Sequence, residues 1–168
     1  SGAYCWGENY NGQLGSTTGP TFSDSIPARV TTNLVFTTIT SGAAHTCGLV
    51  GGTAYCWGYN GYGQVGNNTL VDAPTPVPIA GSLVFSSIDA GAYHTCGITT
   101  ASLAAALDRQ VYCWGNGTSG QLGNAALTNS QIPVRVADPL QTTTRAVLIS
   151  AGQTHTCAVA LNNQAYCW

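Results

Sequence analysis

The segment Gly42-Ala-Ala-His-Thr-Cys-Gly-Leu-Val-Gly-Gly-Thr-Ala-Tyr-Cys-Trp-Gly58 decides the fold, because it describes a β-hairpin residue by residue. Its centre, Gly51-Gly52, is a favoured two-residue hairpin turn. Counting outward from this turn places Cys47 opposite Cys56 on a non-hydrogen-bonded pair, where Cα atoms approach to about 4.5 Å. That separation lies at the short end of the disulfide range. The segment therefore predicts a hairpin closed by a Cys47–Cys56 bond.

The two motifs of this hairpin recur along the whole chain. Gly-x-x-His-Thr-Cys and Tyr-Cys-Trp alternate, and each of the first three Tyr-Cys-Trp motifs is followed by Gly, a polar turn, Gly-Gln-Leu/Val-Gly and a proline segment. The copies are Gly42–Cys47, Gly91–Cys96 and Gly152–Cys157 for the first motif, and Tyr4–Trp6, Tyr55–Trp57, Tyr112–Trp114 and Tyr166–Trp168 for the second. We expect a single repeat array over residues 1–168, with approximate repeats 1–57, 58–114 and 115–168 that each end at Tyr-Cys-Trp.

The repeated segments predict an all-β protein. They are short and rich in Val, Ile, Thr, Tyr and Trp, with Gly and Pro between them. Only residues 101–108 look helical, and they lie inside an insertion of the second repeat. Repeats of about 50 residues with several short strands each are typical of propeller blades or of a β-solenoid.

The other cysteines predict two more cross-strand bonds. Cys157 faces Cys167 across a three-residue turn at 161–163, where Asn tolerates a left-handed conformation. Cys96 faces Cys113 if the insertion 99–110 bulges out as a loop. Three bridges in equivalent places indicate an oxidising compartment, and we expect an extracellular or cell-surface protein.

Cys5 has no predicted partner within the chain, because its mate would lie in a His-Thr-Cys strand before Ser1. The chain begins and ends at the same phase of the repeat. Either it is cut from a longer repeat protein, or a neighbouring subunit completes the first blade through an intermolecular contact at Cys5.

Composition excludes several classes of partner. Charged residues make up 6% of the chain, with no Lys and a net charge of −2, against about 25% charged residues in an average domain. A nucleic-acid binder needs clustered Lys and Arg, so we expect no nucleic acid partner. No apolar run approaches the roughly 20 residues of a membrane helix, so we expect no membrane insertion. Two sequons make Asn67 and Asn116 candidate glycosylation sites.

No catalytic, metal or cofactor site is expected. His45, His94 and His155 occupy one repeat position, which favours a structural histidine bonded to the backbone within each blade over a ring of ligands or bases. The carboxylates share no repeat phase, and no serine lies in a Gly-x-Ser-x-Gly elbow. Blade packing is the expected role of the in-phase tryptophans. We therefore predict that the chain is not an enzyme.

Specificity should lie where the repeats differ. The turns 8–11, 59–62 and 116–119 vary from copy to copy. They carry Tyr10, Tyr59 and Tyr62, which would suit a contact surface for a protein or a carbohydrate.

The combination of these motifs resembles the regulator-of-chromosome-condensation repeat over essentially the whole chain. The resemblance implies propeller blades of four antiparallel strands, with about three blades here, too few for a closed seven-bladed ring. Cysteines stand where nuclear members commonly carry apolar or small residues, so the chain looks more like the secreted bacterial branch. Guanine-nucleotide exchange, known for the nuclear member, does not carry over.

Two functions of different class follow from these patterns. The first is a non-catalytic extracellular propeller module for adhesion or binding, whose partner is a protein or a glycan. The alternative is a structural subunit that joins copies of itself head to tail into a ring or a filament.

Overall fold

A computed structural model describes residues 2–17, 22–100, 109–137 and 145–168. The described residues form strands, turns and irregular segments without an α-helix, so the all-β prediction is confirmed. The helical expectation for 101–108 lies outside the described residues. None of the described segments forms a helix long and apolar enough to cross a membrane. The strands are β1 Tyr4–Glu8, β2 Ser23–Arg29, β3 Thr38–Ser41, β4 His45–Val50, β5 Thr53–Gly58, β6 Ala73–Pro78, β7 Phe85–Ala90, β8 His94–Thr99, β9 Val111–Gly115, β10 Ser130–Arg135, β11 Ala146–Ala151, β12 Thr156–Ala160 and β13 Ala165–Cys167.

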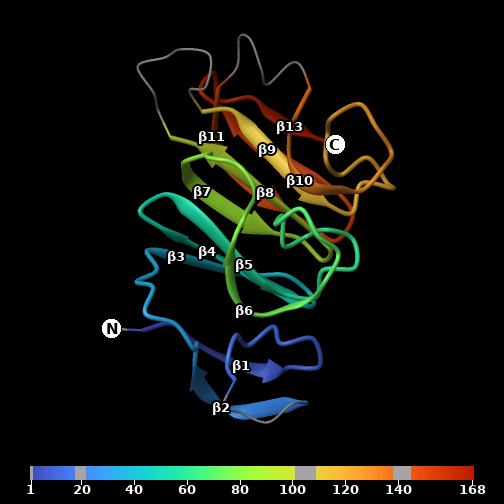
Figure 1. Cartoon of the computed structure of the whole chain (residues 1–168). Helices are drawn as coiled ribbons and strands as arrows, with labels where there is room; N and C mark the ends of the chain where they lie inside the picture. The colour runs from blue at the N-terminus through green and yellow to red at the C-terminus, as the bar shows by residue number, and fades with distance from the viewer. Residues whose placement is uncertain (1, 18–21, 101–108, 138–144) are drawn as a thin grey trace.

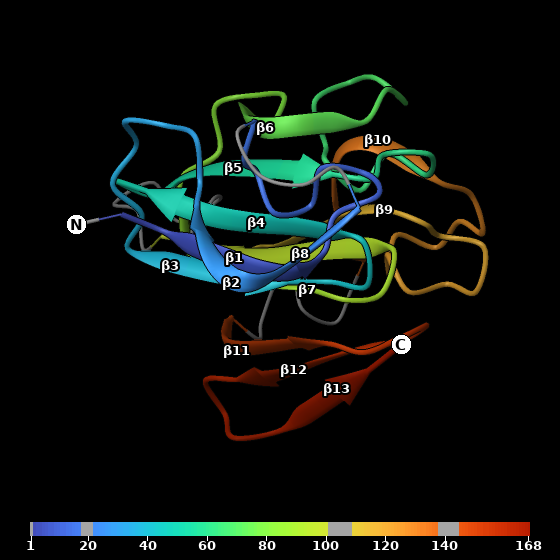
Figure 2. The ribbon, with the colours of Figure 1, turned by 90° about the horizontal axis from the view of Figure 1, so that it is seen from below.

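The strands form four antiparallel sheets that follow one another along the chain (Figure 1). Two sheets have four strands, in the orders β3-β4-β5-β6 and β7-β8-β9-β10. The sheet β11-β12-β13 has three strands and the sheet β1-β2 has two. Each four-stranded sheet takes its last strand from beyond a Tyr-Cys-Trp motif, so the blades run across the boundaries of the sequence repeats. Figure 2 shows β6, β5 and β4 side by side as strands of one sheet.

The hairpin predicted from Gly51-Gly52 is present with the predicted register. Both glycines have positive φ, 57° and 85°, as a primed hairpin turn requires. Leu49 pairs with Ala54, and Cys47 pairs with Cys56. At the three-residue turn of the last hairpin, Asn163 adopts a φ of 61°. Short-range turn chemistry therefore sets the register of these strands.

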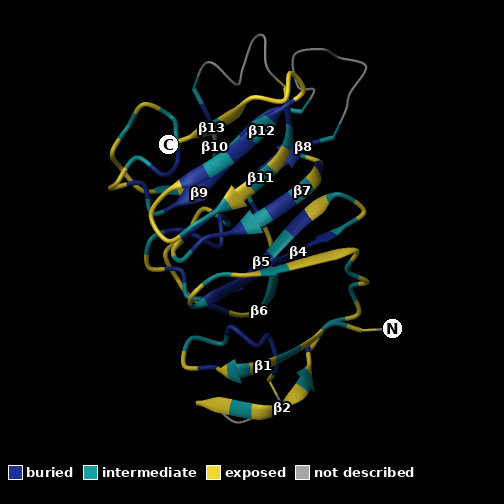
Figure 3. Ribbon diagram, turned by 180° about the vertical axis from the view of Figure 1, so that it is seen from behind, coloured by how far each residue is buried: buried dark blue, intermediate teal, exposed yellow. Residues whose placement is uncertain are grey.

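The core lies between the sheets and is unevenly distributed along the array (Figure 3). Strands β4, β5, β8 and β9 are mostly buried, whereas β1 and β2 contain no fully buried residue. Trp57 and Trp114 are completely buried, while the in-phase Trp6 is 62% exposed. Trp168, at the end of the last sheet, is half-buried and packs against the core as well, so the expected blade packing is present for three of the four tryptophans.

Candidate binding face

The strands of every sheet run between two opposite faces of the array. At one end of the strands lies the loop face, which carries the turns that follow the Tyr-Cys-Trp strands and the loops 42–44, 91–93 and 152–154. The other end, the hairpin face, carries the turns 51–52 and 161–163. A backbone hydrogen bond of 2.8 Å from Tyr59 N to Ala44 O ties the two kinds of loop together on the loop face.

The charged residues are separated between these two faces. Among the residues that the structure describes, the carboxylates lie at strand ends next to the loop face, and the guanidinium groups lie next to the hairpin face. The carboxylates are Glu8, Asp24, Asp72 and Asp89, and the cations are Arg29, Arg109, Arg135 and Arg145. Of the charges on the described residues, the negative ones therefore lie towards the loop face.

Buried amides hold the turns of the loop face in place. Asn60 is fully buried, and its Oδ1 accepts the N–H of Val65 at 2.9 Å. Gln64 Oε1 accepts the N–H of Tyr62 at 3.0 Å. In the first repeat, Asn9 and Gln13 make the same two kinds of bond, to Leu14 and Asn11. The variable side chains therefore project from a rigid and repeated frame.

Three tyrosines meet on this frame, and we call Tyr59, Tyr62 and Tyr93 the tyrosine cluster. The ring centroids lie 5.9 Å apart for Tyr59–Tyr62, 6.2 Å for Tyr59–Tyr93 and 5.5 Å for Tyr62–Tyr93. Tyr10 instead packs on Phe22, with centroids 5.3 Å apart. The structure thus brings together two of the three tyrosines expected from sequence and adds Tyr93.

Sequence reasoning missed Tyr93 because it lies between the Gly and the His of Gly-x-x-His-Thr-Cys, inside a repeated motif. The variation at this position was nevertheless visible, since the other copies carry Ala44 and Thr154 there. Only the packing of consecutive blades places this loop beside the turn 59–62.

Asp72 lies at the edge of the tyrosine cluster. Its Oδ1 accepts the N–H of Asn60 at 2.8 Å, and the residue is exposed. Desolvation, followed by the nearby Tyr62, Asp72 and Tyr93, raises the pKa of Tyr59 above its usual value. Negative charge is therefore disfavoured on the Tyr59 hydroxyl, and the Asp72 carboxylate already places one negative charge near it.

His45 and His94 link neighbouring blades, so for these two histidines the expected side-chain bond to backbone within one blade is wrong. His45 Nε2 lies 2.9 Å from Thr95 Oγ1, and His94 Nε2 lies 2.8 Å from Thr156 Oγ1. Each threonine hydroxyl also donates to a Gln main-chain oxygen, and Thr95 donates to Gln64 O at 3.0 Å. Each His-Thr pair thus joins two successive repeats.

Burial keeps these two histidines neutral. It lowers the pKa of His45 to about 3 and that of His94 to about 4, with each neighbouring histidine contributing and Asp89 opposing the shift at His94. Within the described residues, no group of three His, Cys, Asp or Glu could hold a metal ion.

The three predicted cysteine pairs are bonded in the structure, with Cα–Cα distances of 4.0 to 4.1 Å. Cys5 is a half-buried free thiol, and burial raises its pKa. The sequon residues Asn67 and Asn116 are both half-buried, and each accepts a 2.8 Å bond from the threonine hydroxyl two residues on.

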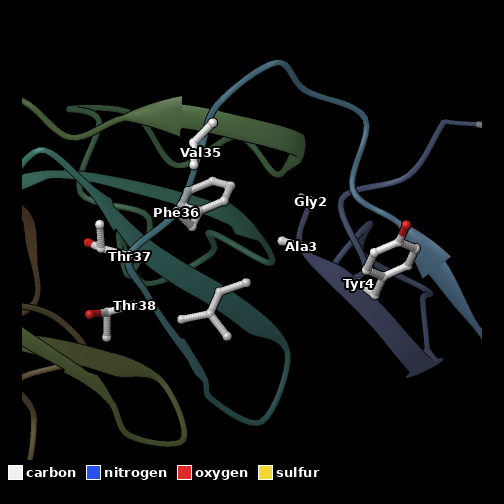
Figure 4. A pocket seen from close by; sticks show the side chains of 8 residues that line it. Gly2, Ala3, Tyr4, Val35, Phe36, Thr37 and Thr38 are labelled. Atoms are coloured by element: carbon white, nitrogen blue, oxygen red, sulfur yellow. The ribbon is translucent and has the colours of Figure 1, made fainter.

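A groove separates β1 from the neighbouring blade. Figure 4 shows it with Phe36 on one side and Ala3 on the other, and its volume is about 240 Å³. A second groove of about 380 Å³ runs between β1 and the loop 42–46, lined in part by Cys5, Trp6 and His45. Both grooves lie where the two-stranded sheet meets the first complete blade.

Comparisons with known proteins agree with this architecture. The model of the regulator of chromosome condensation (RCC1) repeat matches residues 2–49, 51–98 and 108–159. The ultraviolet-B receptor UVR8 of Arabidopsis thaliana is 27% identical over 165 residues, which cover 97% of this chain and 36% of that protein. The chain thus spans about a third of the length of this relative.

Solved structures show the same fold. Prp20p from Saccharomyces cerevisiae superposes with a TM-score of 0.81 at 20% identity, over 94% of this chain and 39% of that one. Human WBSCR16 also gives a TM-score of 0.81, at 17% identity, over 99% of this chain and 42% of that one. With three family matches across most of its length and this fold, the chain belongs to the regulator of chromosome condensation (RCC1) repeat family.

Proposed function

We propose that this chain is a non-catalytic β-propeller module that binds another protein, or a glycan, through its loop face in an extracellular, oxidising compartment. The observation that carries the proposal is the concentration of exposed apolar side chains on this face. The loops between the third and fourth strands expose Phe22, Leu70, Val71 and Leu127 by 50 to 73%. Each of these loops thus offers a large apolar side chain to a partner that binds this face.

The rigid frame beneath these loops supports the same conclusion. Variable side chains on a fixed scaffold are the usual arrangement of a recognition surface. Prp20p, which shares this fold, binds Gsp1p and histones, and this is consistent with a protein-binding role for such a propeller. The three disulfides support the oxidising compartment.

A variant of each face tests the proposal. The loop-face variant replaces Phe22, Leu70 and Leu127 with Ser, one in each repeat and none in the tyrosine cluster. The hairpin-face variant replaces Val84 and Leu161, which are 46% and 54% exposed, with Ser. Both variants and the unmodified chain are applied to arrays of immobilised extracellular proteins and of glycans.

We expect that the ligands captured by the unmodified chain are retained by the hairpin-face variant and lost by the loop-face variant. Loss confined to the hairpin-face variant would refute the proposal, as would a chain that captures no ligand on either array.

The exposure of Trp6 favours head-to-tail self-assembly as a second candidate function. The equivalent Trp57 and Trp114 are completely buried against a neighbouring sheet, so a further sheet packed on β1 would cover Trp6 in the same way. Sedimentation analysis of the intact chain and of a Trp6→Ser variant tests this candidate. Self-association that the variant abolishes is expected, and a monomer at all concentrations would exclude it.

A further inference from the structure

The tyrosine cluster differs from the other aromatic contacts of the protein because it lies at the surface. Phe85 and Trp114 pack with centroids 5.9 Å apart inside the core, and both are buried. Tyr59 and Tyr62 are half-buried and Tyr93 is 38% exposed. Three large rings are thus held together at the surface and do not belong to the buried core.

The ring geometry favours a cation over a sugar. The interplanar angles are 82° for Tyr59–Tyr62 and 77° for Tyr59–Tyr93, so the rings pack edge to face. Such packing leaves no flat surface that extends over several rings, which an extended glycan would use, but it does present a single ring face. The face of each aromatic ring carries the negative part of its quadrupole, which attracts Lys and Arg side chains.

The charge around the cluster favours the same partner. The Asp72 carboxylate is anchored beside the rings by its 2.8 Å bond from Asn60 N. The four described carboxylates all lie towards this face, and the four arginines lie towards the opposite one. A basic partner would be attracted to the loop face and an acidic partner repelled from it.

We propose that the tyrosine cluster and Asp72 form a subsite for an arginine side chain of a partner protein. The guanidinium group stacks against a tyrosine face while the carboxylate accepts its N–H groups. The partner is therefore a protein with a basic contact segment. This inference rests on the proposed function, since it assigns the partner class for the loop face.

Other copies of the repeat supply structurally safe substitutions. Ala44 is the counterpart of Tyr93 in the preceding repeat. Tyr93→Ala therefore introduces a residue that the chain already carries at this repeat position. Asn129 is the counterpart of Asp72, and its Oδ1 accepts the N–H of Gly117 at 3.1 Å. Asp72→Asn is therefore expected to keep its bond to Asn60 while losing the charge.

The probes are a hexa-arginine peptide, a hexa-glutamate peptide and chitohexaose, titrated calorimetrically into the full chain at low salt. Matched controls come from the same face: Tyr10→Ala removes a tyrosine outside the cluster, and Asp24→Asn removes a carboxylate away from it. We expect the unmodified chain to bind hexa-arginine and not hexa-glutamate. Tyr93→Ala and Asp72→Asn should each weaken binding by about tenfold, whereas each control should change it less than about twofold.

Three outcomes would overturn the inference. If the cluster variants and the control variants lost the same amount of hexa-arginine affinity, binding would depend on the face as a whole and not on the tyrosine cluster. Chitohexaose binding that depends on Tyr93, without hexa-arginine binding, would assign a glycan and leave the proposed function intact. Absence of binding by every probe would reject the arginine subsite, while the array experiment with the loop-face and hairpin-face variants still decides the proposed function independently.

Discussion

At the scale of single residues, the His-Thr pair is an inter-blade connection with a defined proton arrangement. Thr95 Oγ1 has one proton, and it donates this proton to Gln64 O. His45 Nε2 must therefore be the donor in its 2.9 Å bond to the same hydroxyl. With the pKa of His45 lowered to about 3, the ring is neutral and carries its proton on Nε2.

Removal of this hydroxyl should destabilise the protein. Thr95→Val leaves the buried His45 Nε2 without its partner, while Gln64 O keeps the 2.9 Å bond from Trp114 Nε1. We expect a loss of about 1 to 3 kcal/mol in the free energy of unfolding. Thr53 is an exposed residue beside the turn of the β4-β5 hairpin, and Thr53→Val should change the free energy of unfolding by less than about 0.5 kcal/mol. Urea titration measures both. A loss for Thr95→Val as small as that of the control would contradict the proposed hydrogen-bond network.

The free energy of unfolding should also decrease as the pH is lowered. The pKa of His45 is about 3 in the folded protein, below its value of about 6.5 in an unfolded chain. Between these pH values the unfolded state binds more protons, so the stabilisation is complete above pH of about 6.5 and is lost as pH falls towards 3.

Each such histidine contributes up to about 1.4 kcal/mol per pH unit in this window. Urea titrations between pH 7.5 and 4.5 measure the slope, and His45→Gln should reduce it, leaving the contribution of His94. A slope that is equally steep in the variant would contradict the assignment to His45.

At the scale of elements, the cross-strand disulfides recur in three hairpins at equivalent positions. Their Cα atoms are paired by strand register alone. The turns differ in length, yet each returns the chain to the same register at the cysteine pair. The hairpin is therefore the repeated building element of the array, and the second hairpin keeps the same cysteine register in spite of the insertion 99–110.

Alkylation under denaturing conditions tests the pairing. Without reduction we expect one labelled thiol, at Cys5, and after reduction all seven cysteines should react. Replacing Cys96 and Cys113 together with Ser should cost about 3 kcal/mol of stability, by the chain-entropy model for a loop of this length. Peptide mapping that finds Cys5 bonded to another cysteine within the same chain would contradict this pairing.

At the scale of the whole molecule, the sheets are unequal in burial although they share motifs. β1 and β9 have related sequences, but β9 is mostly buried and β1 is not (Figure 3). Because local stability follows burial and packing, opening should begin at the sheet β1-β2. The middle blades should open only with global unfolding.

Hydrogen exchange measures this gradient. Backbone amides of β1 should exchange much faster than those of β9, which serves as the matched control in the same repeat position. Equal protection in a concentrated sample, lost on dilution, would show that another molecule covers β1. Equal protection at every dilution would contradict the gradient.

The sequence by itself determined the repeat, the all-β class and the hairpin register. These depend on contacts within about ten residues, such as Cys47 with Cys56 across Gly51-Gly52, and turn chemistry decides them. Only the tertiary structure showed that His45 bonds to Thr95, 50 residues away, and that Tyr93 joins Tyr59 and Tyr62. Such contacts depend on how one blade is rotated against the next, which no local pattern specifies, because blade packing places loops from different repeats side by side.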